Sequence, residues 1–419
     1  MKKRVALITH EMSLVGGLPT MITFLYRTLL ESGRYQPELI SLATSASDSA
    51  SLQLKAPRTW FRGAKIEQVP WHDFVFTHVG VWGSELEFQR YRRRRKLTEV
   101  LQRYDLLQFV VGSPPWVCTA DGADRPIFLW TATTTRADRA SQMRRGSILR
   151  RAWSSLMVRI SERYERRALK ATHSVFALSE YTQATVQSIT GPGKVVLAPC
   201  GVDTDLFRPA EKPDGSYIVC VARFSDPRKN LALLLHAYAM VQKRVAVAPD
   251  LYLIGDPPSE EVRLHLQSLG LAHKVKLIGP KQGEELAELY RKAFFFVLTS
   301  NEEGLGIVIL EAMASGLPVV STACGGPATA VLEAETGFLT PIGDASAMAD
   351  AMETLLRDPA LCARMAKAGR RIAEERFSLA AAGKVFLDRY DDLLNGRESE
   401  LQCQESMEDS FSVMPAALR

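Results

Sequence analysis

The chain has 419 residues, of which 46% are hydrophobic and 24% charged, a composition typical of a soluble globular protein with about two or three domains. No apolar run approaches the ~20 residues needed to cross a bilayer, and the apolar run in MKKRVALITH is too short for a signal peptide. The six cysteines form no close pair, which favours reduced thiols. We therefore expect a cytoplasmic protein without a membrane span.

The net charge of +5 is concentrated in two basic clusters. Between Arg136 and Lys170 there are eleven Lys/Arg and three Asp/Glu, an excess of +8, and the second cluster contains the run YRRRRK. We expect Arg144–Lys170 and Arg90–Lys96 to face an anionic partner, either a membrane surface or a phosphorylated substrate, with a plain solvated surface as the alternative. No recognised nucleic-acid-binding module accompanies the charge, so we expect no nucleic-acid partner.

In the first half of the chain, short apolar runs alternate with amphipathic stretches. The runs predicted to be buried strands are Val5–Thr9, Gln36–Leu42, Leu106–Val111, Ile127–Trp130, Ser174–Leu178 and Val195–Ala198. Between them, Pro19–Glu31 and Arg92–Arg103 have the spacing of helices, and the small polar segment Thr44–Ser51 predicts a surface loop. Strands that alternate with helices indicate a parallel sheet covered on both faces.

The pattern restarts after the Pro-, Gly- and Asp-rich segment Gly201–Tyr217. The strands and helices predicted there are Tyr217–Val221, Asn230–Lys243, Leu251–Gly255, Glu260–Leu269, Val275–Ile278, Glu284–Arg291, Phe294–Thr299, Gly306–Ala314 and Pro318–Ser321. We predict an α/β fold of two doubly wound, Rossmann-like parallel-sheet domains, residues 1–208 and 209–377, which face each other across a ligand-binding cleft. The polar composition of residues 396–419 predicts a mobile tail.

Two glutamates frame a Gly-Leu-Gly turn in NEEGLGIVILEAMASGLPVV, residues Asn301–Val320. The turn joins a predicted strand to a helix, whose free N–H groups and partial positive charge favour a phosphate. Gly304 and Gly306 let a ligand approach the backbone without a Cβ in the way. Glu303 would point into the cleft and Glu311 lies about two turns further along, and carboxylates are suited to bind sugar hydroxyls. A helix-capping role for Glu303 and a surface position for Glu311 are the alternative.

A second strand-to-helix turn carries cations. In YIVCVARFSDPRKN, Arg223 ends the strand and Lys229 precedes the helix, and two positive charges beside a helix start are suited to clamp a diphosphate. In the other domain, Gly16 and Gly17 follow the first strand and again permit close approach of a ligand. They do not form a G-x-G-x-x-G fingerprint, which argues against a standard dinucleotide site.

These segments together resemble the retaining nucleotide-sugar glycosyltransferases of the GT-B fold, family 4, also called glycosyl transferases group 1. The matching pieces are VGG near the start, APCGVDTDLFRP at the seam, VARFSDPRKN, EGLGIVILEAMASGLPVVSTACGG and TGFLTP. The resemblance implies transfer of a sugar from a UDP- or GDP-sugar to a glycan, lipid-linked or other small acceptor, in cell-surface polysaccharide or glycolipid synthesis. It also implies that a last helix, residues 378–395, returns to the first domain.

Carried over by position, the resemblance implies catalytic roles for Arg223 and Lys229, which would bind the diphosphate, and for Glu303, which would contact the donor sugar. Glu311 would hold the ribose. The other donor-binding residues that it implies are Gly16, Gly17, Gly304, Leu305, Gly306, Ile307 and Val308. Because fixed cations and a helix dipole neutralise the charge that builds on a leaving diphosphate, we expect no metal and no other cofactor.

Two departures from the family pattern bear on activity. Relatives have a histidine in the first-domain loop that here reads WTATTTRAD, where this chain has Thr131 and Thr133–Thr135. Thr329 stands where relatives often carry glutamate. His10, beside the Gly-Gly loop, is a hypothetical substitute for the missing histidine, with a structural role as the alternative. A catalytically silent nucleotide-sugar-binding or membrane-surface protein therefore stays open, and another GT-B reaction, such as epimerisation or phosphorolysis, is the third possibility.

Within the larger basic cluster, the sequence predicts one long amphipathic helix. Its apolar positions, which recur at helical spacing, are Ile148, Leu149, Ala152, Trp153, Leu156, Met157, Ile160 and Tyr164, and arginines occupy the opposite face. Two interpretations fit this pattern. Either the apolar stripe packs against the first sheet, or the helix attaches the protein peripherally to anionic lipid at the inner face of the plasma membrane.

Overall fold

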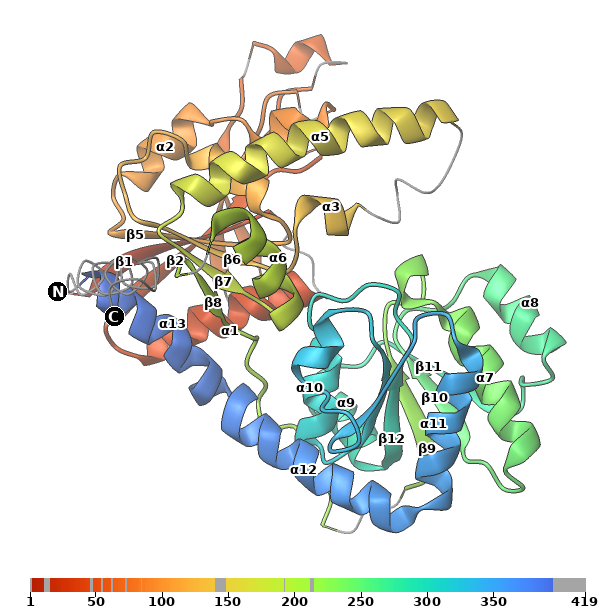
Figure 1. Ribbon diagram of the computed structural model, residues 1–419. Helices are drawn as coiled ribbons and strands as arrows, with labels where there is room; N and C mark the ends of the chain where they lie inside the picture. The colour runs from red at the N-terminus through yellow and green to blue at the C-terminus, as the bar shows by residue number, and fades with distance from the viewer. Residues whose placement is uncertain are drawn as a thin grey trace, which may run out of the picture.

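The computed structural model describes residues 2–10, 16–45, 48–53, 56–61, 63–71, 74–83, 85–139, 148–191, 193–211 and 215–394. This part of the chain forms two α/β units, each built on its own sheet, and the second sheet begins at Tyr217 (Figure 1). The predicted fold class is therefore confirmed. The predicted tail, residues 396–419, lies outside the described residues.

The first sheet has eight strands in the order β3-β4-β2-β1-β5-β6-β7-β8. Neighbouring strands are parallel, except that the edge strand β3 runs antiparallel to β4. The strands are β1 (Lys3–Thr9), β2 (Tyr35–Leu42), β3 (Ile66–Trp71), β4 (Phe74–Val79), β5 (Leu106–Val111), β6 (Ile127–Thr131), β7 (Ser174–Ala177) and β8 (Val195–Leu197). The helices of this unit are α1 (Gly17–Glu31), η1 (Pro57–Thr59), η2 (Glu87–Tyr91), α2 (Arg95–Leu101), η3 (Pro114–Ala120), α3 (Thr135–Asp138), α5 (Ile148–Ala171) and α6 (Glu180–Thr190).

The second sheet has six parallel strands in the order β11-β10-β9-β12-β13-β14. They are β9 (Tyr217–Val221), β10 (Asp250–Ile254), β11 (Val275–Gly279), β12 (Ala293–Leu298), β13 (Val319–Thr322) and β14 (Gly337–Thr340). The accompanying helices are η4 (Pro227–Lys229), α7 (Leu231–Arg244), α8 (Glu260–Ser268), α9 (Gly283–Arg291), α10 (Ile307–Ala314), η5 (Gly326–Thr329) and α11 (Ala345–Arg357). The strands and helices predicted for this half of the chain are confirmed to within two residues at either end, while β14 was not predicted.

The segment between β2 and β4 differs from its prediction. Strands β3 and β4 were not predicted, and the proposed surface loop at Thr44–Ser51 is wrong at its C-terminal end, where Ala50 and Ser51 are 1% and 2% exposed. The side chain of Asp48 explains the burial, since it accepts hydrogen bonds from the Ser51 hydroxyl at 2.9 Å and pairs with Nε2 of His78 at 2.7 Å. These contacts hold the loop against β4.

Two consecutive helices connect the units at the end of the described chain. Helix α12 (Pro359–Phe377) packs on α10 of the second unit, and α13 (Leu379–Leu394) packs on α1 of the first (Figure 1). Where the chain crosses, the N–H of Val202 donates to the carbonyl of Phe377 at 2.7 Å. The second unit is thus tied to the first by two crossings, the linker before β9 and the step from α12 to α13, which form a parallel β-bridge between Val202 and Ser378.

An aromatic cluster fixes α13 on the first unit. Phe386 is fully buried, and its ring centroid lies 4.7 Å from that of Trp130 and 4.4 Å from that of Phe176. One turn further on, the Tyr390 hydroxyl donates to Oε1 of Gln108 at 2.5 Å inside the core. Because these rings come from β6, β7 and α13, the last helix completes the core of the first unit.

Replacing Phe386 with alanine should lower the free energy of unfolding by about 3–5 kcal/mol, because truncating a buried phenylalanine removes its contacts and leaves a cavity. Chemical denaturation followed by circular dichroism measures the change. Lys384→Ala is the matched control on the same helix, since its side chain is 73% exposed, and it should alter stability by less than ~0.5 kcal/mol. Equal effects of the two variants would contradict the role given to the cluster.

Candidate active site

A cavity of about 2450 Å³ lies between the two units. Ligand pockets usually measure roughly 300–1,000 Å³, so this one has room for two ligands at once. Every residue that the sequence predicted for the donor site lines it, namely Gly16, Gly17, Arg223, Lys229, Glu303, Gly304, Leu305, Gly306, Ile307, Val308 and Glu311. The topology explains this convergence, because the carboxyl ends of parallel strands meet at one edge of a sheet.

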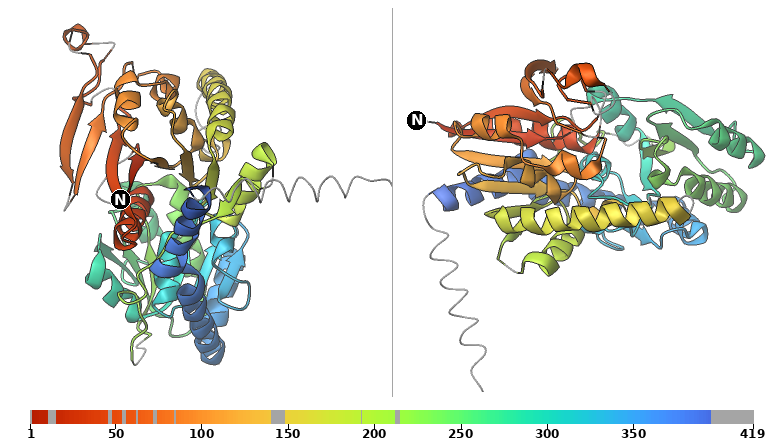
Figure 2. Two further views of the ribbon diagram at one scale, coloured as in Figure 1. Left: turned by 90° about the vertical axis from the view of Figure 1, so that its left-hand side faces the viewer. Right: turned by 90° about the horizontal axis from the view of Figure 1, so that it is seen from above.

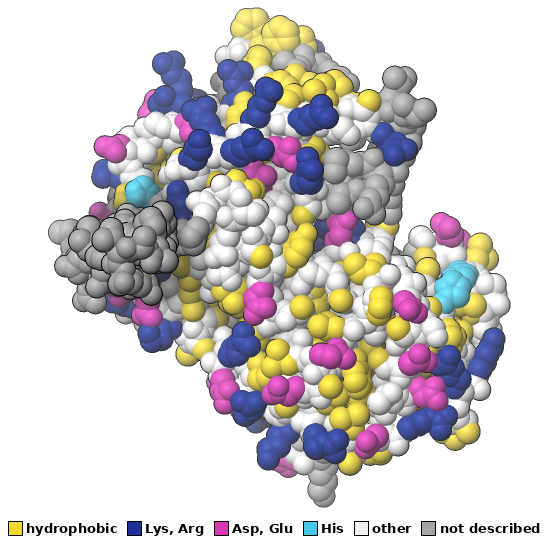
Figure 3. Space-filling model, viewed as in Figure 1, with side chains coloured by type: hydrophobic (Ala, Val, Ile, Leu, Met, Phe, Trp, Pro, Cys, Tyr) yellow, Lys and Arg dark blue, Asp and Glu magenta, His cyan; other side chains and the backbone are white. Residues whose placement is uncertain are grey.

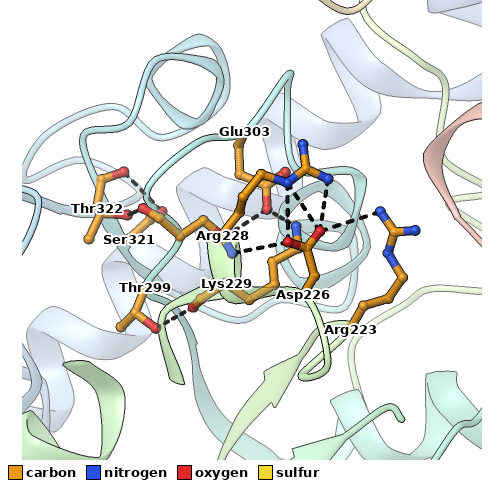
Figure 4. Close-up of polar contacts among 9 residues, drawn as sticks. Arg223, Asp226, Arg228, Lys229, Thr299, Glu303, Ser321 and Thr322 are labelled. Atoms are coloured by element: carbon orange, nitrogen blue, oxygen red, sulfur yellow. Dashed lines mark hydrogen bonds and ion pairs between the residues drawn. The ribbon is translucent and has the colours of Figure 1, made fainter. Parts of the chain in front are cut away.

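A buried ion pair joins two loops at this edge. The Lys229 ammonium donates to the carboxylate of Glu303, and the Ser300 hydroxyl donates to the same Oε1 atom at 2.9 Å (Figure 4). The side chains of Lys229 and Glu303 are only 15% and 12% exposed. The Thr299 hydroxyl also donates to the carbonyl of Lys229 at 3.2 Å. The loop after β12 therefore fixes both the backbone and the charged end of Lys229.

The two arginines near this pair differ in how firmly they are held. The Arg228 guanidinium donates to Asp226 at 2.8 Å, whereas Arg223 lies 3.8 Å from the same carboxylate and its side chain is 49% exposed (Figure 4). Burial disfavours the charged form of Asp226, but the hydrogen bonds from Arg228 outweigh it and hold the pKa of that carboxyl below its ordinary value. Arg228 is thus engaged by Asp226, while the guanidinium of Arg223 extends toward the cavity.

The turn before α10 brings backbone amides to the cavity wall. Gly306 has φ +84°, a left-handed conformation in which a Cβ is strained. A Cβ at Gly304 would lie 3.2 Å from the Cβ of Ala132 in the first unit. Glycine at 304 therefore lets the two units approach, and glycine at 306 turns the chain into the helix.

Glu311 lies deeper in the cavity, on α10. The Tyr290 hydroxyl donates to its Oε2 atom at 3.1 Å. Burial raises the pKa of Glu311 to about 7. The alternative of a surface position for Glu311 is therefore wrong, and this carboxyl changes its protonation state near neutral pH.

The first unit contributes backbone rather than charge at the point opposite Arg223. Gly16 has φ +136°, and a Cβ built on it would lie 4.0 Å from Nη1 of Arg223. Gly17 begins α1, where the first N–H groups of a helix have no partner within the helix. The two glycines and the arginine therefore face one another across the cavity.

The threonine-rich loop contributes little polar surface to the cavity. Thr131, Thr134 and Thr135 are 0%, 5% and 2% exposed, and only Thr133 of the four lines the cavity. The Thr131 hydroxyl is used locally, donating to the carbonyl of Gly112 at 3.2 Å. This loop is consequently held by the first unit's own backbone.

His10 lies on the same wall of the cavity. Its ring stacks on Trp116, with centroids 4.6 Å apart, and its Nδ1 atom has no hydrogen-bond partner among the described residues. Desolvation lowers the pKa of His10 to about 4, so the imidazole is neutral at neutral pH, and its Nδ1 atom is buried.

Sequence reasoning missed one buried acid behind this wall. Glu165 of α5 is 3% exposed and accepts the N–H of Thr135 at 2.9 Å. Burial raises the pKa of Glu165 to about 7. The sequence placed Glu165 among arginines on an amphipathic helix, and only its inward helical position could have indicated burial.

Sequence reasoning also missed a contact between the units at Thr329. Its hydroxyl accepts the N–H of Glu180, the first residue of α6, at 3.0 Å. Nearby, a Cβ on Gly325 would lie 3.1 Å from the ring of Tyr181. The position where relatives often carry glutamate is therefore buried between the units in this structure.

The segment Asp203-Thr204-Asp205 has the Asp-x-Asp spacing of some metal sites. Here Oδ1 of Asp203 accepts the N–H groups of Asp205 and Leu206 at 3.0 and 2.9 Å, which is a local turn. Among the described residues, no group of three or more His, Cys, Asp or Glu side chains is arranged to hold a metal ion.

One arginine of the smaller basic cluster is buried, contrary to the prediction. Arg94 is 7% exposed and donates to the carbonyls of Val79 and Ala43 at 2.6 and 3.0 Å, so the prediction that all of Arg90–Lys96 faces a partner is wrong at this residue. Burial lowers the pKa of Arg94 to about 9. Its neighbours Arg92, Arg93, Arg95 and Lys96 are exposed.

The predicted amphipathic helix is confirmed as α5, although residues 140–147 of the cluster lie outside the described residues. Its C-terminal half packs on the first unit through Ala168 and Leu169, which are 0% and 1% exposed. Towards its N-terminus, Trp153 and Leu156 are 57% and 49% exposed. Packing therefore accounts for only part of the apolar stripe. None of the helices in the described ranges has the length and apolar character to span a membrane.

Two family models match consecutive parts of the chain. Residues 15–206 match Glycosyltransferase Family 4, and residues 202–372 match Glycosyl transferases group 1. The chain is 32% identical over 224 residues to a D-inositol 3-phosphate glycosyltransferase of Stackebrandtia nassauensis, covering 49% of this chain and 50% of that protein. It is 31% identical over 264 residues to a GDP-mannose-dependent alpha-(1-6)-phosphatidylinositol monomannoside mannosyltransferase of Mycobacterium tuberculosis, covering 57% of this chain and 67% of that protein.

Solved structures with the same fold extend over nearly the whole chain. Sucrose-phosphate synthase from Thermosynechococcus elongatus has a TM-score of 0.73 at 21% identity and covers 94% of this chain and 100% of its own. HepE from Anabaena, in complex with UDP and glucose, has a TM-score of 0.68 at 18% identity and covers 93% of this chain and 100% of its own.

The two-sheet architecture and the charged cleft thus define a protein of the GT-B fold. The chain belongs to glycosyltransferase family 4, the glycosyl transferases group 1. It spans about half of the length of the first relative named above and about two thirds of the second.

Glu311 should make stability depend on pH. Its pKa lies above the ordinary value of 4.5 in the folded protein, so ionising it costs stability as the pH rises through about 7. The glutamine of Glu311→Gln does not ionise. The free energy of unfolding of this variant, relative to that of the wild type, should therefore rise by up to about 3 kcal/mol between about pH 5 and pH 8. Denaturation curves at several pH values measure this difference, with the exposed Glu288→Gln as control. Parallel pH profiles for wild type and Glu311→Gln would refute the assignment.

Proposed function

We propose that this protein transfers a glycosyl group from a UDP- or GDP-sugar, with retention of anomeric configuration, to a glycan, lipid-linked or other small acceptor. The observation that carries the proposal is the buried pair of Lys229 and Glu303, which joins the turns that precede α7 and α10. Two desolvated charges at a helix N-terminus, in a cavity large enough for two ligands, suit a phosphorylated sugar better than a purely structural role.

In this proposal the second unit binds the donor. Lys229 and Arg223 neutralise the diphosphate as the glycosidic bond breaks, together with the amides at the start of α10, so that charge is stabilised where it develops. Glu303, which Ser300 and Lys229 hold in place, accepts hydrogen bonds from the donor sugar. Glu311 accepts hydrogen bonds from the ribose hydroxyls. Two fixed cations make a divalent ion unnecessary, so we propose a metal-independent reaction.

The relatives support this class of donor and acceptor. One is named for GDP-mannose and a phosphatidylinositol mannoside, another for inositol 3-phosphate, and HepE was solved with UDP. We propose by analogy that this protein works in cell-surface polysaccharide or glycolipid assembly, on the cytoplasmic side of the membrane. The exposed cations of Arg90–Lys96 and of α5 would then face anionic lipid.

A catalytically silent binder of nucleotide sugars is the second candidate, because the threonine-rich loop has no histidine. The neutral His10, which lines the cavity and whose Nδ1 atom has no hydrogen-bond partner among the described residues, is the residue that would take the place of that histidine. His10→Ala separates the two possibilities. Loss of turnover with donor binding retained would assign His10 to the reaction, whereas unchanged turnover would leave it the structural role of stacking on Trp116.

The first test is a panel of nucleotide sugars on metal-free protein, following thermal stabilisation and release of nucleoside diphosphate. A donor at ~100 times its Kd should stabilise the fold by ~2.7 kcal/mol, and added chelator should leave both signals unchanged. Stabilisation without release, with candidate acceptors present, would favour the silent binder. No stabilisation by any nucleotide sugar would refute both candidates.

Substitutions in the ion pair should abolish most of the turnover. Lys229→Ala and Glu303→Gln should each lower kcat by roughly 10²–10³-fold, because preorganised charge at the reacting group is lost. The matched control is the exposed pair of Lys292 and Glu288, whose charged atoms lie 3.9 Å apart on α9 and its C-terminus. Lys292→Ala and Glu288→Gln should retain full activity. Equal activity of the two sets of variants would disprove the assignment.

A further inference from the structure

Three aromatic side chains are exposed together at one end of the first unit. Trp60, Phe61 and Trp82 are 53%, 96% and 51% exposed. Trp60 and Phe61 directly follow η1, which projects beyond the rest of the molecule (Figure 2). Figure 3 shows hydrophobic side chains gathered at this end, with Lys and Arg side chains around them. We call Trp60, Phe61 and Trp82 the aromatic knob.

Hydrogen bonds hold the aromatic knob in a defined shape. The Trp60 indole N–H donates to the carbonyl of Gln53 at 2.8 Å, and the adjacent residue, Leu52, forms a β-bridge with Trp82. The Thr59 hydroxyl donates to the carbonyl of Ala56 at 2.7 Å and closes the η1 turn. These contacts hold the Trp60 ring, the η1 turn and the backbone of Trp82 in defined positions.

The surroundings of the aromatic knob are positively charged. Lys96 donates to the carbonyl of Ala64 at 2.7 Å, which places the exposed side chains of Arg92, Arg93, Arg95 and Lys96 at the base of the knob. Arg58 lies within η1 itself and is exposed. Exposed aromatic side chains next to exposed cations match the layered chemistry of an anionic bilayer surface.

We propose that the aromatic knob inserts into the headgroup region of an anionic membrane while the surrounding cations bind lipid phosphates. A second copy of the chain is a poorer occupant, because it would bring the same positive charge to the interface. A single weak anchor gives only marginal, reversible attachment, whereas an apolar and an electrostatic signal together give stable binding. The inference deepens the membrane setting of the proposed function, but it does not depend on the sugar chemistry.

Vesicle flotation without any nucleotide sugar tests the proposal. Wild-type protein should float with vesicles of phosphatidylglycerol and phosphatidylethanolamine and not with phosphatidylcholine alone. Phe61→Ser should weaken this binding at least tenfold. The double variant Trp60→Ala/Phe61→Ser should weaken it further. Val247→Ser is the matched control, since Val247 is 88% exposed on the second unit, and it should bind as the wild type does. Arg92→Ala/Lys96→Ala should lower binding most at low salt, where electrostatic attraction is strongest.

Three results would overturn the proposal. They are failure of the wild type to float with anionic vesicles, equal binding of wild type and Phe61→Ser, and a wild-type dimer that Phe61→Ser converts to monomer, which would make a second copy the occupant. Stabilisation by nucleotide sugars, measured without vesicles, should be the same in wild type and Phe61→Ser. Its absence from both would count against the proposed function alone and leave the vesicle result intact.

Discussion

The cleft is organised around the ion pair between Lys229 and Glu303. A buried pair of charges loses hydration and adds little net stability, while removing one partner leaves an uncompensated charge. The fold brings the pair together because β9 and β12 are neighbours in the sheet, although Lys229 and Glu303 are 74 positions apart in the sequence. Ser300 and Thr299 then fix the carboxylate and the lysine backbone. Such support is what a preorganised site for a charged ligand requires.

The sequence predicts the second unit well because its strands are short apolar runs bounded by Gly, Pro and Asp, as Tyr217–Val221 shows. It predicts the segment of β3 and β4 poorly, since that hairpin is half exposed and carries no continuous apolar run. Nor does the run of arginines before α2 indicate which one points inward. Arg94 is buried because carbonyls from Val79 and Ala43 happen to converge on it, and that convergence exists only in three dimensions.

The residues of the site likewise separate into those that the local sequence pattern predicts and those that depend on contacts distant in the sequence. Arg223, Lys229 and Glu303 could be placed in one cleft from sequence, because each stands at a strand-to-helix turn and the carboxyl ends of parallel strands share an edge. The buried Glu165 could not be found in this way, since its environment depends on Thr135, 30 residues away. The same holds for the neutral state of His10, which results from burial beside Trp116.

The contact at Thr329 is one of several neutral contacts between the two units. Its hydroxyl meets the first N–H of α6, a position where a carboxylate would bind more strongly through charge and the helix dipole. Gly304 and Gly325 meanwhile bring backbone against Ala132 and Tyr181 with no side chain between. At these points the units meet through neutral, closely packed groups, whereas charged side chains of both units line the cavity. Because the contact at Thr329 is a neutral hydrogen bond, separating the units at this point would break no ion pair, whereas a carboxylate at the helix N-terminus would bind the units more strongly whether or not a ligand were present.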